Sequence, residues 1–129
     1  MTEEKLIEFV TKLEAKTLSG NVKWEETAAT DVFQATLSSF VIRICRSEAR
    51  DGSTDLEIDL VSKDGTIIES LSDGQFLRMV RKYQSAGALL EVNAHGVMES
   101  IFTSARRMAL GVDKALDDVL SELNGESPH

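Results

Sequence analysis

Residues 40–65, FVIRICRSEARDGSTDLEIDLVSKDG, decide the fold. Apolar side chains occupy every second position in 40–45 and again in 56–60, and this period of two is typical of half-buried strands. An Asp-Gly dipeptide follows each run, at 51–52 and at 64–65, and favours the tight turn of a hairpin. Because antiparallel strands can be joined by such short turns, the stretch predicts neighbouring antiparallel strands.

Further strand candidates lie on both sides of this stretch. Residues 32–37 alternate in the same way, residues 22–24 include the single tryptophan, and residues 66–71 follow the second Asp-Gly turn. Together these segments predict a five-stranded antiparallel meander. One face of the sheet is expected to pack against helices through Phe40, Ile42, Ile44, Leu56, Ile58 and Leu60.

Amphipathic helices are predicted before and after the meander. In residues 3–17 apolar side chains recur at spacings of three and four, with Thr2 in position to cap the helix and Gly20 in position to stop it. Ser72 and Gln75 form a capping-box pattern, which predicts a second helix that reaches about residue 84.

The C-terminal third combines an ambiguous segment with the longest helical periodicity. Gly87 indicates a break, and the structure of residues 85–96 is left open between helix, strand and loop. From residue 97 to residue 123 apolar side chains step by four and three. This spacing predicts one continuous helix of about 27 residues, roughly 40 Å long, with Gly111 on its outer side.

Length and composition set the class of protein. The chain has 129 residues, of which 42% are hydrophobic and 28% charged, which suits one ordinary globular domain. We therefore predict a single two-layer α+β domain over residues 1–129, with a disordered tail at about 124–129. It comprises an N-terminal helix, the five-stranded meander, and two or more C-terminal helices ending in a long helix.

Charge and residue counts disfavour several functions. The net charge is −8, which argues against binding to duplex nucleic acid. One cysteine and two histidines offer little for a metal site, so neither a metal nor another cofactor is predicted. The sequence lacks the features of a secretion signal and of a membrane span. We therefore expect a soluble, cytoplasmic protein without a membrane partner.

The order of several short motifs resembles a group of small bacterial domains that have no established activity. In that group a helix ending in T-x-x-G precedes a tryptophan-bearing strand, an antiparallel meander and a C-terminal helix rich in alanine and arginine. The matching elements here are Thr17 to Gly20, Trp24 and the segment 105–116, ARRMALGVDKAL. The resemblance implies the same fold and supplies no catalytic residue or cofactor.

No catalytic residue is predicted from the sequence. His95 is the one internal histidine, and no second histidine or cysteine is spaced to share a metal with it. Cys45 falls in a predicted strand without a neighbouring base, so a structural thiol is favoured over a nucleophile. Glu57 and Asp59 belong to the predicted polar face of the sheet, where solvated carboxylates are the simpler interpretation.

A few exposed side chains are candidates for an interaction surface. Arg78 and the pair Arg106 and Arg107 lie in predicted helices and can bind an anion or an acidic partner, unless they pair with nearby carboxylates. Trp24 is either a binding residue or, as is more common, part of the core.

The long predicted helix favours self-association, because a domain of this size cannot easily cover 40 Å of apolar stripe. The residues expected to pair with a second copy are Met108, Val112, Leu116, Val119 and Leu123. We therefore predict a homodimer and a non-enzymatic interaction or oligomerisation module, with a further, unidentified protein partner. The alternative is a small-ligand-binding domain or a carboxylate-based hydrolase, with a pocket between the sheet and the long helix near Arg106 and Arg107.

Overall fold

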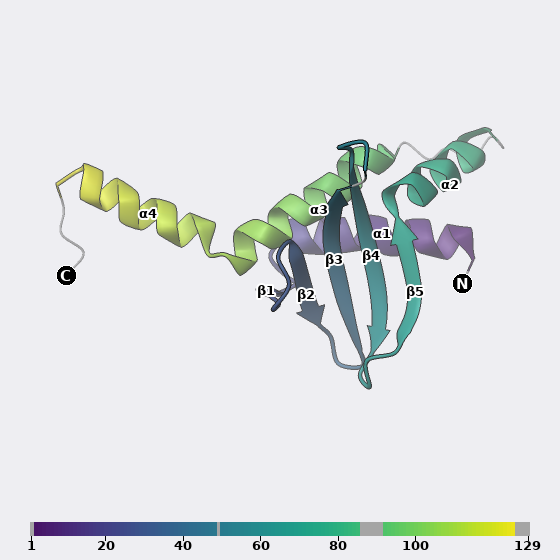
Figure 1. Ribbon diagram of the computed structural model, residues 1–129, viewed down its shortest axis with the longest axis horizontal. Coiled ribbons are helices and arrows are strands. Elements are labelled where there is room, and N and C mark those ends of the chain that lie inside the picture. The colour runs from purple at the N-terminus through teal and green to yellow at the C-terminus, as the bar shows by residue number, and fades with distance from the viewer. Residues whose placement is uncertain (1, 49, 86–91, 126–129) are drawn as a thin grey trace.

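The computed structural model describes residues 2–48, 50–85 and 92–125 (Figure 1). In chain order the elements are α1 (Glu3–Leu18), β1 (Trp24–Glu26), β2 (Val32–Thr36), β3 (Phe40–Glu48), β4 (Thr54–Ser62), β5 (Ile67–Ser72), α2 (Asp73–Ser85), α3 (Ala94–Ala109) and α4 (Val112–Leu123). The strands form one antiparallel sheet in the order β1-β2-β3-β4-β5. The predicted α+β fold, with its meander between N-terminal and C-terminal helices, is confirmed.

The predicted helix starts are confirmed by their hydrogen bonds. The Thr2 hydroxyl accepts a bond from the Lys5 backbone N–H at 3.3 Å and so caps α1. At the start of α2, the Gln75 side chain accepts from the Ser72 N–H at 3.1 Å, and the Ser72 hydroxyl accepts from the Gln75 N–H at 3.3 Å. This reciprocal pair is the capping box that the sequence predicts.

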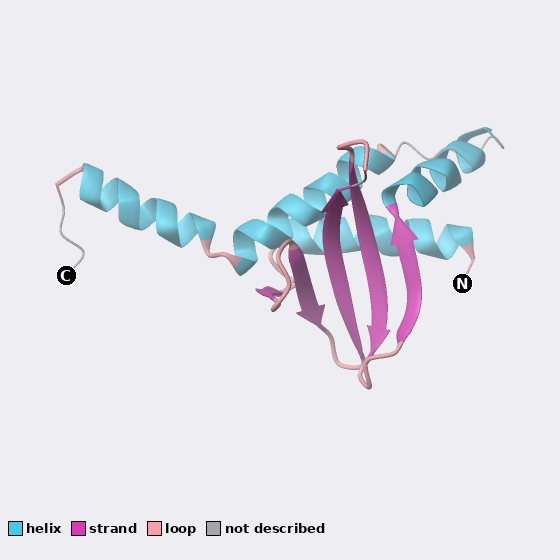
Figure 2. Ribbon diagram, viewed as in Figure 1, coloured by secondary structure: helices cyan, strands magenta, loops and turns pink. Residues whose placement is uncertain are grey.

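Helices α1, α2 and α3 cover one face of the sheet and form the second layer (Figure 2). In the register of the two central strands, Ile44 lies opposite Ile58 and Ile42 lies opposite Leu60. Four of the six predicted inward residues, Ile42, Ile44, Leu56 and Ile58, are buried. They meet buried side chains from all three helices, including Val10, Leu13, Phe76, Met98 and Ile101.

The other two predicted inward residues are less covered than expected. Phe40 is 41% exposed, and Leu60 is only partly buried. Phe40 begins β3 and Leu60 lies two residues before the end of β4, and these ends of the two strands extend beyond the helices in Figure 1. The expectation that all six side chains pack against helices is therefore wrong for Phe40, because the helical layer is shorter than the strands.

The prediction of one continuous helix through Gly111 is wrong. Gly111 has φ +63° and ψ +37°, a left-handed conformation that a right-handed helix cannot pass through. Helix α3 ends at Ala109, and α4 begins again at Val112. The apolar spacing continues across the break because spacing alone does not report the backbone angles of a glycine. As a result, α4 extends away from the body of the domain (Figure 1).

Two sequence predictions fall partly outside the described residues. The proposed break at Gly87 and residues 88–91 of the ambiguous segment lie outside them, whereas Ala94 begins α3. In the predicted tail, Asn124 and Gly125 form a turn, and residues 126–129 are not among the described residues. Within the described part, no helix has both the length and the apolar character needed to cross a bilayer.

Candidate functional site

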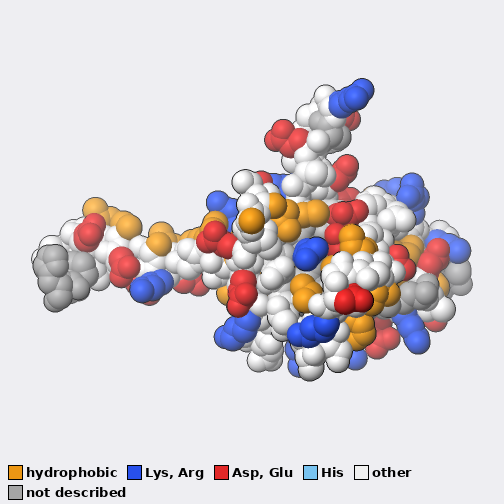
Figure 3. All heavy atoms as spheres, turned by 60° about the horizontal axis from the view of Figure 1, so that its bottom comes forward, with side chains coloured by type: hydrophobic (Ala, Val, Ile, Leu, Met, Phe, Trp, Pro, Cys, Tyr) orange, Lys and Arg blue, Asp and Glu red, His pale blue; other side chains and the backbone are white. Residues whose placement is uncertain are grey.

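The apolar face of α4 is largely exposed in the part of the chain that the structure describes. None of the twelve residues of α4 is buried. Its large apolar side chains are spaced for one side of a helix, and four of them are between 48% and 76% exposed. We call this set the α4 stripe: Val112, Leu116, Val119, Leu120 and Leu123. Figure 3 shows hydrophobic side chains along one edge of the projecting helix and charged ones along the other.

The predicted pairing residues divide between α3 and α4. Val112, Leu116, Val119 and Leu123 belong to the α4 stripe, whereas Met108 packs against the core of its own domain. The Met108 sulfur accepts a hydrogen bond from the Trp24 backbone N–H at 3.3 Å. Leu120 was missed by the sequence analysis, although it follows Leu116 by four residues and so lies on the same side of the helix.

The rest of α4 is acidic. Four carboxylates and one lysine give the helix a net charge of minus three: Asp113, Asp117, Asp118, Glu122 and Lys114. The Arg107 guanidinium donates to the Asp113 carboxylate at 2.5 Å across the break between α3 and α4. This exposed ion pair accounts for Arg107, which is therefore not a free cation for a separate anion.

Trp24 is a core residue. Its side chain is 3% exposed, and its indole N–H donates to the Thr17 hydroxyl at 3.1 Å. Thr17 is itself buried, so the bond satisfies two polar groups that water cannot reach. A residue enclosed in this way is not available to a partner, which favours the core interpretation of Trp24.

The two basic groups lie at separate places on the domain. Arg78 lines a hollow of about 320 Å³ together with residues of α1 and β5. Arg106 lines a different hollow of about 360 Å³ between the end of α3 and the β1–β2 connection. They do not border one shared surface, because α2 and the C-terminal end of α3 lie toward opposite sides of the domain (Figure 1).

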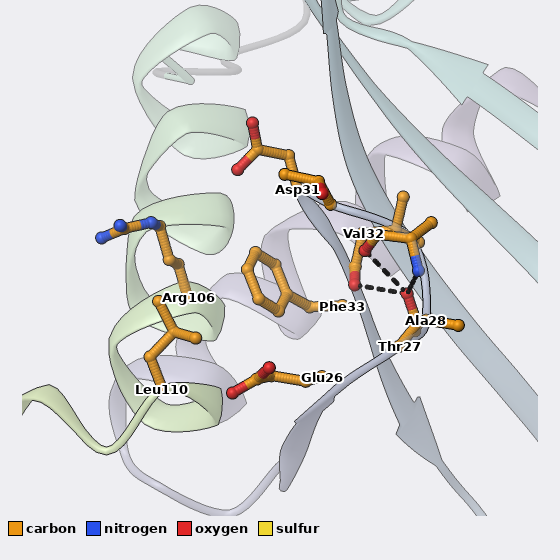
Figure 4. Close-up of a pocket in the computed structure, with 10 residues that line it drawn as sticks. Glu26, Thr27, Ala28, Asp31, Val32, Phe33, Arg106 and Leu110 are labelled. Atoms are coloured by element: carbon orange, nitrogen blue, oxygen red, sulfur yellow. Dashed lines mark hydrogen bonds between the residues drawn. The ribbon is translucent and has the colours of Figure 1, made fainter.

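The hollow beside Arg106 is the closest match to the predicted pocket. Figure 4 shows the Arg106 guanidinium directed away from Phe33, which lines the same hollow. The Thr27 hydroxyl is already bonded within the loop, to the Val32 carbonyl at 2.8 Å. The Asp31 carboxylate is engaged by Arg46 at 3.3 Å. The Thr27 and Asp31 side chains are therefore already engaged within the protein, whereas Glu26 and Arg106 also line the hollow.

His95 lies between two carboxylates at the start of α3. Its Nδ1 is 3.3 Å from Asp73, and its Nε2 is 3.2 Å from Glu99. Both ring nitrogens therefore have a carboxylate neighbour. Among the described residues, no group of three or more histidines, cysteines and carboxylates is placed to hold a metal ion.

The outer face of the sheet holds Cys45 beside two carboxylates. The thiol donates to Glu57 at 3.9 Å, and Asp59 accepts from the Ser70 hydroxyl at 2.7 Å. Partial burial, followed by the negative charges of Glu57 and Asp59, raises the pKa of the Cys45 thiol. Burial and then the charge of Asp59 also raise the pKa of Glu57. A thiol held protonated in this way is a poor nucleophile.

Slow alkylation of Cys45 is therefore expected. At pH 7.5, iodoacetamide should modify it several-fold more slowly than it modifies glutathione, because less thiolate is present. The rate is measured by intact-mass spectrometry. The Glu57→Gln variant removes one negative neighbour and should react faster than the unmodified protein. A rate equal to that of glutathione would contradict this account of the site.

Comparison of the chain with protein-family models, curated protein sequences and solved structures finds no match. No relative therefore contributes a function, and the resemblance to small bacterial domains stays a prediction.

Proposed function

We propose that the protein is a non-enzymatic interaction and oligomerisation module in which α4 is the docking element and a second copy of the chain is the partner. The observation that carries the proposal is the exposure of the α4 stripe. A helix with one apolar side is ordinarily stabilised by packing that side against something. Here the described part of the chain buries none of the α4 residues.

The energy available from covering the stripe is substantial. Complete burial of one leucine or valine side chain is worth about 1.5–3 kcal/mol, and the exposed parts of Leu116, Val119, Leu120 and Leu123 are each about half of the side chain or more. Association must also offset the loss of translational and rotational freedom. A second copy is the simplest source of the missing surface, because closed homodimers are the commonest oligomers.

The alternative, a ligand-binding or hydrolytic pocket near Arg106, has less support. The hollow there is of a volume that suits a small ligand. However, its threonine and aspartate are engaged within the protein, and Arg106 points away from Phe33. Arg107 pairs with Asp113 and does not line the hollow. We therefore prefer association through α4.

The proposal is tested by the double variant Leu116→Gln/Val119→Gln. Light scattering at about 50 µM should give the unmodified protein twice the chain mass of 14.2 kDa and the variant the chain mass itself. Because neither residue is buried, the free energy of unfolding of the monomer should change by less than about 0.5 kcal/mol.

The matched control changes the opposite side of α4. Lys114→Gln/Ser121→Ala alters one exposed and one partly exposed residue outside the stripe and should leave the mass at twice that of the chain. A single-chain mass for the unmodified protein at this concentration, or a dimeric Leu116→Gln/Val119→Gln variant, would refute the proposal.

A further inference from the structure

The open end of the sheet carries a second apolar surface that is exposed among the described residues. Leu37 is 43% exposed and Phe40 is 41% exposed. The Leu37 N–H donates to the Phe40 carbonyl at 2.8 Å, so the two residues lie side by side. By strand alternation both face the helical side of the sheet, since Leu37 is in phase with Ala35 and Phe40 with Ile42. Figure 3 shows hydrophobic side chains at this end of the molecule, with basic ones among them.

One flank of α1 forms a wall beside this surface. Phe9 lies within one turn of Lys5 and Lys12, and Lys16 follows Phe9 by seven residues, so the four side chains lie on the same flank of the helix. Phe9 and Leu60 line the same small hollow, which shows that this flank faces the sheet. All three lysines are exposed, and Lys12 also forms an exposed ion pair with Glu8 at 3.4 Å.

We take the wall and the open end of the sheet together as one apolar surface, which has lysines along its α1 side and Glu69 of β5 beside Leu60. We call it the basal groove and define it by Phe9, Leu37, Phe40 and Leu60, with Lys5, Lys12 and Lys16 along the α1 side. α1 is 16 residues long, or about 24 Å, and α4 is 12 residues long, or about 18 Å. An α4 helix therefore fits alongside α1 within its length.

The charges of α4 match the lysines on the α1 side of the groove. The acidic residues Asp113 and Glu122 flank opposite sides of the α4 stripe, as their helical spacing requires, and Asp113 already pairs with Arg107 of its own chain. When the stripe contacts the apolar part of the groove, one acidic flank faces the lysines of α1. Complementary charge of this kind fixes register and discriminates between partners.

Pairing of α4 with α4 alone is the weaker arrangement. A stable interface buries about 800 Å² per partner and involves some 20–30 residues on each side, whereas α4 has 12 residues in all. It would also bring together two helices that each carry a net charge of minus three. Docking on the body of a second copy supplies more area and opposite charge. The helix does not lie on its own groove, since α4 leaves the domain near β1 and extends away from it (Figure 1).

We infer that α4 of one copy docks in the basal groove of a second copy, and that the exchange is reciprocal. This inference rests on the proposed function, because it names the surface that receives the α4 stripe. Each dimer then contains two equivalent junctions related by twofold symmetry.

The test is charge reversal of the groove in the full chain, with Lys12→Glu/Lys16→Glu. Sedimentation velocity should show at least a tenfold weaker dimer than for the unmodified protein. The control Lys23→Glu/Arg81→Glu makes the same change in net charge at exposed positions outside the groove and should dimerise as the unmodified protein does. Circular dichroism melts establish that both variants fold.

Mixing the groove variant with the α4 variant tests whether α4 of one copy binds the groove of the other. Lys12→Glu/Lys16→Glu keeps its helix α4, and Leu116→Gln/Val119→Gln keeps its groove, so an equimolar mixture should form a heterodimer through one intact junction. Carbodiimide cross-linking of a ¹⁴N/¹⁵N mixture of the unmodified protein should also join the α1 lysines to α4 carboxylates between chains.

The outcomes distinguish this inference from the proposed function. If the lysine variant dimerises as well as its control while Leu116→Gln/Val119→Gln is monomeric, α4 associates elsewhere and the groove assignment is wrong. Absence of a heterodimer in the mixture, or cross-links only between residues of one chain, would also overturn the exchange. A monomeric unmodified protein would overturn both.

Discussion

Replacement of Trp24 by alanine is expected to lower the free energy of unfolding by about 3–5 kcal/mol, the range for truncating a large buried aromatic side chain. The indole is 3% exposed. Its removal leaves a cavity and also deprives the Thr17 hydroxyl of its donor at 3.1 Å. Urea denaturation followed by circular dichroism measures the loss.

Two further variants separate packing from hydrogen bonding at this position. Trp24→Phe retains much of the ring but leaves the buried Thr17 hydroxyl without its donor, at an expected cost of about 1–3 kcal/mol. In Thr17→Val the hydroxyl is absent, and the indole N–H is left unpaired at a similar cost. If Trp24 were instead a binding residue, Trp24→Phe would weaken the dimer while leaving the monomer stable, and our interpretation would fail.

The strands were predictable because their pattern is local. A period of two determines which side chains share a face, and a slip of one residue would turn that face to solvent. Ile42, Ile44, Leu56 and Ile58 were therefore assigned correctly. The exposure of Phe40 was not predictable in this way, because it depends on how far the helices reach along the sheet, and strand alternation does not report this.

In the helical region, by contrast, the local pattern gave a wrong prediction at Gly111. Its neighbours keep their apolar spacing, so the pattern alone favours a continuous helix. A glycine tolerates both the helical and the left-handed conformation, and the sequence does not specify which one is adopted. The left-handed conformation of Gly111 ends the predicted long helix at this position. As a result, α4 is a separate helix that has no buried residue.

The basal groove could not be predicted from the sequence, because it depends on contacts between distant parts of the chain. The spacing of Lys5, Lys12 and Lys16 was available in the sequence and places them on one flank of α1. What that flank faces depends on the contact of Phe9 with the hollow at Leu60, which joins distant parts of the chain. Similarly, Arg78 and Arg106 both lie on helices, but only the arrangement of those helices shows that they border different hollows.

Truncation of Phe102 to alanine is the second change expected to have a large effect, a loss of about 3–5 kcal/mol in the free energy of unfolding. The side chain is 4% exposed, and its ring centroid lies 5.6 Å from that of Phe33 in a tilted arrangement. The Arg46 guanidinium lies 4.9 Å from the Phe102 ring centroid. Arg46 also pairs with Asp31 at 3.3 Å, so the ring supports a cation that anchors the β1–β2 connection.

Phe102→Leu is the matched variant, since it keeps most of the buried apolar volume and removes the aromatic face. It should cost less than Phe102→Ala, because a smaller cavity remains. A double-mutant cycle with Arg46→Met isolates the contact between the guanidinium and the ring, for which about 0.5–1 kcal/mol is expected at a partly exposed site. Additive effects of Phe102→Leu and Arg46→Met would show that the two side chains do not stabilise one another. Arg46 would then hold the β1–β2 connection through Asp31 alone.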